Sequence, residues 1–120
     1  MTVTTIETPD YTLVTVAGEL DLYTAPSLGE AISGLIREGT HHLVIDLTRV
    51  EFLDSTGLGV LVGARKKINA SSGSLQLVCD QDRLLKLFRL TDLINVFVIH
   101  DTVEAASAGP EARTATQSDL

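Results

Sequence analysis

Asp54, Ser55 and Thr56 place a carboxylate beside two hydroxyl groups in the string "DSTG". They stand where a strand-like stretch gives way to a helix-like one. Asp and Ser both suit the residue that caps a helix, because their side-chain oxygens accept hydrogen bonds from free backbone N–H groups. The same position suits a phosphate on Ser55, because a helix N-terminus carries partial positive charge. These residues alone leave a plain helix cap and a phosphorylation site both open.

A phosphate on Ser55 would change the charge of the surface around it. It would add nearly two negative charges next to Asp54. A partner that binds the unmodified hydroxyl would then be repelled. The pattern therefore indicates a switch, provided that a kinase recognises it.

Three glycines follow in the same helix-like segment, at Gly57, Gly59 and Gly63. A glycine inside a helix costs about 1 kcal/mol relative to Ala, so three of them require a reason. Close packing of the helix on a sheet would explain one or two. Alternatively, Gly59 and Gly63 lie four residues apart on one face and would let another chain approach. Both explanations stay open.

Two further carboxylates, Glu19 and Asp21, lie in the loop-like string "GELDLYTAP". Paired carboxylates can perform acid–base chemistry, but no third group stands nearby in sequence to complete a mechanism. We interpret them as solvated or capping groups that matter again if the loop lies near Ser55.

Enzymatic and metal chemistry find little support in the rest of the chain. Ser55 is not in a G-x-S-x-G elbow, and there is no phosphate-binding G-x-x-x-x-G-K-[ST] loop. His41, His42, His100 and the single Cys79 do not have metal-ligand spacing. We predict no enzyme, no metal and no cofactor, and we expect Cys79 to be a buried small residue.

Composition limits the class of protein. The 120 residues fit one domain, and 44% of them are hydrophobic. No apolar run is long enough to span a bilayer, the start of the chain is not a signal peptide, and one cysteine fits a reducing cytoplasm. The formal net charge of −7 argues against nucleic-acid and membrane partners and favours a basic protein partner.

Hydrophobic periodicity predicts strands that alternate with helices. An opening antiparallel hairpin, divided at Pro9, precedes parallel pairings, so the fold class is α/β. Thr24 is expected to cap the first helix and Gly39 to end it. The predicted strands are 2–8, 11–17, 41–47, 75–79 and 95–100, and the predicted helices are 24–38, 56–70, 82–90 and a short one at 102–108, with 48–53 as a connector and 109–120 as a disordered tail.

Four strings together resemble a known family. "GELDLYTAP", "LVIDLTRVEFLDSTGLGVLVGARKK", "GSLQLV" and "RLLKLFRLTDL" resemble the anti-sigma factor antagonists, which are stand-alone STAS domains of bacterial partner-switching systems. The resemblance covers about residues 16–98, and "DSTGLG" is specific only together with "GELD". It implies a STAS domain over 1–108, with a small mixed β-sheet of about five strands packed against about four helices. The Ser72-Gly73 pair departs from the Gly-Gly often seen in the family, and we expect this to affect only a turn.

The resemblance also implies a function and a site. The unphosphorylated protein would bind an anti-sigma factor that is also a serine kinase, and would thereby free the sigma factor. That kinase would phosphorylate Ser55 and release the antagonist, and a PP2C-type phosphatase would reset it. Asp21 would lie beside the phosphorylation site, and Thr56 would be the less favoured acceptor. The partner-binding residues that we predict are Asp21, Asp54, Thr56, Gly57, Leu58 and Gly59.

Two alternatives stay within this fold. One is an interaction module of another assembly, such as a stressosome-like complex or a lipid-transport system. The other is a constitutive antagonist that is never phosphorylated, or one controlled by an intermolecular disulfide.

Overall fold

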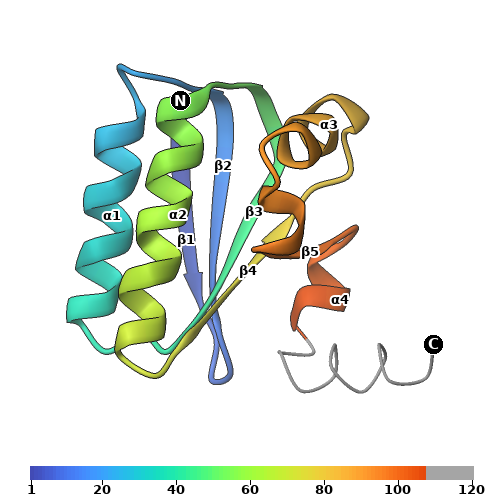
Figure 1. Ribbon diagram of the computed structural model, residues 1–120. Helices are drawn as coiled ribbons and strands as arrows, with labels where there is room; N and C mark the ends of the chain where they lie inside the picture. Colours follow the sequence, from blue (N-terminus) through green and yellow to red (C-terminus); the bar gives the residue numbers. More distant parts are fainter. Residues whose placement is uncertain (108–120) are drawn as a thin grey trace.

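The computed structural model describes residues 1–107. The predicted disordered tail at 109–120, and the predicted domain end at 108, lie outside these residues. Within them, five strands form one mixed sheet in the order β1-β2-β3-β4-β5 (Figure 1). The strands are β1 (Thr2–Glu7), β2 (Thr12–Leu20), β3 (His42–Leu53), β4 (Ser74–Val78) and β5 (Val98–His100). The helices are α1 (Ala25–Arg37), α2 (Ser55–Ala70), α3 (Asp82–Leu90) and α4 (Val103–Ser107), with a 3-10 turn η1 (Leu93–Asn95).

The strand pairings follow the alternation of strands and helices. β1 pairs with β2 in antiparallel fashion, and the three pairings β2–β3, β3–β4 and β4–β5 are parallel. Figure 1 shows α1 and α2 side by side on one face of the sheet. The small helix α4 packs through Ala106 against Val44 and Val78, whose side chains point to the other face of the sheet. The predicted α/β class, the opening hairpin and the mixed sheet with four helices are confirmed.

The main core lies between the sheet and the helices α1, α2 and α3. Alternate residues of β2 and β3, such as Val14 and Ile45, point into it and are fully buried. Leu61 of α2 and Phe88 of α3 cover them. Phe88 meets Phe97 edge to face, with ring centroids 5.8 Å apart. This packing fixes where each helix begins relative to the ends of the strands.

The predicted end of β3 at residue 47 is wrong, because the strand continues to Leu53. Thr48, Arg49, Glu51 and Phe52 made this stretch look like a connector. In the structure it continues to pair with β2 as far as the Leu20–Leu53 pair, with two register irregularities on the way. The strand therefore carries the chain directly to the start of α2.

β2 also runs further than predicted, to Leu20 and not to residue 17, so Glu19 lies in this strand and not in the loop after it. The last strand begins at Val98 rather than residue 95, because residues 93–95 form the turn η1. Thr24 is the N-cap residue of α1, as predicted, but its hydroxyl makes no capping hydrogen bond to the helix.

On the side away from β2, the second half of β3 is bonded by a side chain and not by a strand. β4 pairs with β3 only as far as Asp46. Beyond that point the amide Nε2 of Gln81 donates to the carbonyl oxygens of Leu47 at 2.8 Å, Thr48 at 3.0 Å and Val50 at 3.1 Å. Gln81 immediately precedes α3, so it joins this helix to the strand that leads to Ser55.

Replacing Gln81 by Ala is expected to lower the free energy of unfolding by about 1–3 kcal/mol, because carbonyl groups of β3 lose their donor. Urea denaturation followed by circular dichroism measures the change. Asn69→Ala, at an exposed position near the end of α2, is the control and should change stability by less than about 0.5 kcal/mol. Equal stability of the two variants would contradict the role assigned to Gln81.

Candidate functional site

Asp54 caps α2 and joins it to the loop after β2. Its Oδ1 accepts a hydrogen bond from the backbone N–H of Gly57 at 3.0 Å. Its Oδ2 accepts one from the N–H of Leu22 at 3.2 Å. The Asp54 N–H in turn donates to the carbonyl of Leu20 at 3.3 Å. Asp54 is thus the cap, and the interpretation of Ser55 as a cap residue falls away.

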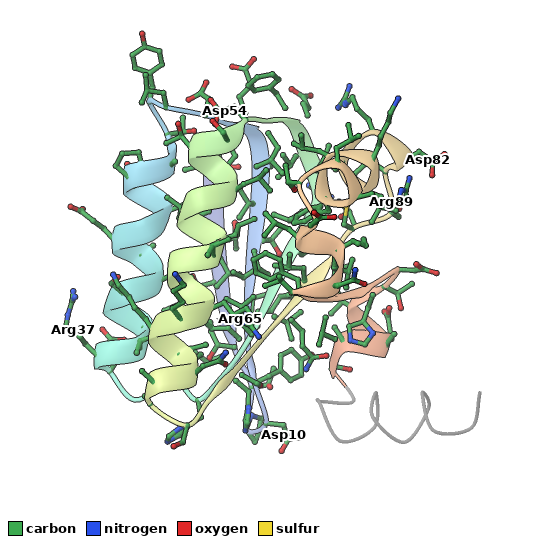
Figure 2. All side chains as sticks on the ribbon, viewed as in Figure 1. Asp10, Arg37, Asp54, Arg65, Asp82 and Arg89 are labelled. Atoms are coloured by element: carbon green, nitrogen blue, oxygen red, sulfur yellow. The ribbon has the colours of Figure 1, made fainter. Side chains whose placement is uncertain are left out.

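Ser55 is the first residue of α2 and is exposed. Its hydroxyl makes no hydrogen bond within residues 1–107. The neighbouring Thr56 is half-buried. Of the two hydroxyl residues, Ser55 is the one that an incoming protein can reach without rearranging the helix. Figure 2 shows Asp54, the residue before it, at the upper end of α2.

The Asp21 carboxylate organises the loop between β2 and α1. Its Oδ1 accepts hydrogen bonds from the N–H of Tyr23 at 2.9 Å and from the N–H of Thr24 at 3.1 Å. The Thr24 hydroxyl also lies 3.2 Å from this oxygen and donates to the Glu19 carbonyl at 2.8 Å. Desolvation raises the pKa of Asp21, but the hydrogen bonds from Tyr23 and Thr24 and the positive charge of the N-terminus outweigh it, so the pKa lies below its ordinary value. Asp21 is therefore a fixed negative charge.

The structure brings the two acidic strings together. The bond from Leu22 to Asp54 joins the "GELD" loop to the start of α2 although 32 residues separate them in sequence. Asp21 is the immediate chain neighbour of Leu22. The sequence-predicted Asp21, Asp54 and Ser55 thus belong to one end of the molecule, where the C-terminal end of β2 meets the N-terminus of α2.

Exposed apolar side chains flank this end, and sequence reasoning missed them. Leu22 is 62% exposed, Tyr23 is 87% exposed and Phe52 is 49% exposed. Large apolar side chains gathered around a polar group are typical of a protein-binding surface. We call Asp21, Leu22, Tyr23, Phe52, Ser55 and Gly59 the Ser55 face. An aromatic residue in the middle of a polar loop was the only signal in the sequence.

The glycines of α2 have different surroundings. A Cβ atom on Gly57 would lie 2.7 Å from Leu53 Cδ1 and 2.8 Å from the Leu20 carbonyl oxygen, so this glycine permits close packing of the helix on the sheet. A Cβ atom on Gly59 or Gly63 would meet nothing within 4 Å. Packing within the chain therefore explains Gly57 and leaves Gly59 and Gly63 unexplained.

Two of the predicted contact residues face inward. Gly57 is buried, and the side chain of Leu58 is 5% exposed and belongs to the core. Neither presents a side chain to the surface, and their role as partner-binding residues stays a prediction. Asp21, Asp54, Thr56 and Gly59 remain candidates.

Outside the Ser55 face, residues 1–107 contain few groups that suggest a metal site, a reactive thiol or a membrane span. Within residues 1–107, no three His, Cys, Asp or Glu side chains are grouped so that they could hold a metal ion. Cys79 is buried, and burial raises the pKa of its thiol. None of the helices in the described part is long and apolar enough to cross a bilayer.

Comparison with known proteins identifies the family to which the chain belongs. A family model for the STAS domain matches residues 2–106. The chain therefore belongs to the STAS domain family. A curated relative, the anti-sigma-B factor antagonist of Staphylococcus epidermidis, is 36% identical over 104 residues, which cover 87% of this chain and 96% of the relative.

Solved structures agree with this family. An anti-sigma factor antagonist from Mycobacterium paratuberculosis superposes with a TM-score of 0.79 at 31% identity, over 97% of this chain and 93% of that one. The Bacillus cell fate determinant SpoIIAA, solved in its phosphorylated form, superposes with a TM-score of 0.69 at 23% identity, over 88% of this chain and 96% of that one. The similarity to SpoIIAA, at 23% identity, shows that the two proteins share a fold.

Proposed function

We propose that this protein is an anti-sigma factor antagonist whose unphosphorylated form binds an anti-sigma factor with serine kinase activity. The single observation that carries the proposal is the exposed Ser55 hydroxyl, which is free of hydrogen bonds within residues 1–107 and lies among exposed apolar side chains. The name of the Staphylococcus epidermidis relative supports the antagonist role. Bound to its partner, the protein frees the sigma factor for transcription.

Phosphorylation of Ser55 by the bound kinase ends the interaction. The Ser55 Oγ forms a bond to the γ-phosphorus of ATP, the bond from that phosphorus to the bridging oxygen breaks, and ADP leaves. The hydroxyl proton passes to a base of the kinase. The kinase supplies ATP and Mg²⁺, so this chain acts as a substrate and binding protein and needs no catalytic group of its own.

The new charge acts through repulsion. Both carboxylate oxygens of Asp54 already accept backbone hydrogen bonds, and Asp21 is held in its charged form. A phosphate on Ser55 therefore joins two fixed negative charges without displacing either cap contact. The kinase is expelled by the added charge at the contact surface, with the fold of the antagonist unchanged.

The resemblance to the anti-sigma factor antagonists implies the rest of the cycle. A PP2C-type phosphatase removes the phosphate and restores binding. We place the cycle in the cytoplasm, where a sigma factor acts, and assign the binding function to a domain that spans 1–108.

Incubation with the candidate kinase and ATP tests the proposal by intact mass. We expect one phosphate on the wild-type protein and on Thr56→Ala, and none on Ser55→Ala. A phosphate gained by Ser55→Ala would overturn the site. A wild-type protein that binds the anti-sigma factor but gains no phosphate would instead support a constitutive antagonist, and absence of binding would favour a STAS module of another assembly.

A further inference from the structure

The exposed side of α3 is basic in an otherwise acidic protein. Arg83, Lys86 and Arg89 are all exposed, while Leu84 and Phe88 of the same helix are buried in the core. The spacing of three residues keeps the cations on one side of the helix. These three are a third of the nine Lys and Arg residues in a chain of formal net charge −7. Asp82, at the start of the helix, is its only carboxylate.

These cations are not neutralised by the protein itself. None of the three has an ion-pair partner within residues 1–107. Arg83 donates to the backbone carbonyl of Glu51, and this is its single hydrogen bond in the described chain. Their charge is thus available to another molecule.

The basic side of α3 adjoins the Ser55 face. The bond from Arg83 reaches Glu51, the residue directly before Phe52. Figure 1 shows α3 beside the upper part of β3, at the same end of the molecule as the start of α2. Gln81 fixes this arrangement through its bonds to β3. In the chain, Phe52 therefore stands between Glu51, which Arg83 contacts, and the start of α2.

We propose that Arg83, Lys86 and Arg89 form a second part of the docking surface, which contacts a carboxylate-rich patch on the same kinase that phosphorylates Ser55. The inference rests on the proposed function. The loop after β2, which contains Asp21, lies on one side of the start of α2, and α3 with its three cations lies on the other (Figure 1). A kinase with basic groups facing the Asp21 loop and acidic groups facing α3 is steered electrostatically into one orientation. In that orientation Ser55 lies at the active site of the kinase.

The second cluster of cations in the chain serves as an internal control. Arg37, Lys66 and Lys67 lie in the last turns of α1 and α2, and Lys67 donates to Ser33 Oγ at 2.8 Å. Figure 2 shows Arg37 and Arg65 toward the end of the helix pair that is opposite to Asp54. Charge changes there alter the net charge equally but lie away from the Ser55 face.

Stopped-flow association of the full chain with its kinase, at low and high salt, tests the inference. Lys86→Glu and Arg89→Glu are expected to lower the association rate constant about tenfold at low salt, and the effect should shrink as salt screens the charges. Lys66→Glu, an equal charge change at an exposed position, should stay within about twofold of wild type. In steady-state phosphorylation, the α3 variants should raise KM and leave kcat unchanged.

The outcomes separate this inference from the proposed function. Wild-type phosphorylation on Ser55, with Lys86→Glu and Lys66→Glu indistinguishable at low salt, would overturn the α3 contact alone. Thermal unfolding midpoints equal to wild type show that each variant is folded. Faster association of the α3 variants would also overturn the inference, because it would assign a basic surface to the partner at this position.

Discussion

Ser55→Glu is expected to weaken binding to the kinase about ten- to a hundredfold at low salt, about 1.4–2.7 kcal/mol. The glutamate places a permanent negative charge at the exposed start of α2, beside the fixed charges of Asp54 and Asp21. Ser55→Gln is the matched control, because it has nearly the same size and no charge. Isothermal titration calorimetry at two ionic strengths measures the affinities.

The salt dependence identifies the cause of the loss. The affinity of Ser55→Ala measures the loss of the hydroxyl, and the affinity of Ser55→Gln adds the effect of a larger side chain. The difference in affinity between Ser55→Glu and Ser55→Gln then measures the effect of the charge. This difference should narrow as the ionic strength rises. Equal affinities of the Gln and Glu variants would contradict a switch based on repulsion, and would point to a steric mechanism.

Gly57→Ala and Gly59→Ala are expected to change stability in opposite directions, although both positions lie in the first turns of α2. The methyl group of Gly57→Ala has to fit within 2.8 Å of the Leu20 carbonyl oxygen, which requires the helix or strand to shift and costs about 1–3 kcal/mol. The methyl group of Gly59→Ala meets nothing within 4 Å, so the gain in helix propensity should raise stability by up to about 1 kcal/mol. Urea unfolding of both variants measures the two shifts.

Gly59→Ala also tests how closely the kinase approaches α2. Gly59 lies one turn after Ser55, so we expect the added methyl group to weaken kinase binding while it stabilises the free protein. Gly63→Ala is the control, because its surroundings are equally open and it lies one turn further along the helix. A variant at Gly59 that is more stable and binds as tightly as Gly63→Ala would show that the partner leaves this turn uncovered.

Much of the fold follows from local patterns, and the exceptions have physical reasons. Alternating and continuous apolar runs predicted β2 and the first half of β3, because burial of apolar side chains sets those patterns. The second half of β3 was missed because Thr48, Arg49 and Glu51 belong to a strand whose outer positions face water. Its pairing is with the end of β2, a contact that is distant in sequence and leaves no local signal.

The charged and hydroxyl residues of the candidate site could be named from the sequence, but their arrangement in space could not. Asp54 and Ser55 are adjacent in sequence, so the cap and the candidate acceptor were visible together. The bond between Asp54 and Leu22 depends on how the end of β2 meets α2, and only the fold shows it. The exposure of Tyr23 and Phe52 and the inward direction of Leu58 likewise depend on packing around them. The roles of Gly57 and Gly59 could be separated only by the distances to their neighbours.

The contact of Gln81 with β3 has a consequence for aggregation. A sheet edge with unpaired carbonyl and N–H groups is a template on which a strand from another chain can add. Because β4 ends opposite Asp46, the remaining edge of β3, which leads to the exposed Phe52, would be such a template. The Gln81 amide occupies carbonyl groups along that edge, at Leu47, Thr48 and Val50, and so blocks a foreign strand from adding there. Together with the contact of Arg83 with the Glu51 carbonyl, this bonding leaves the end of β3 a poor template for a strand from another chain.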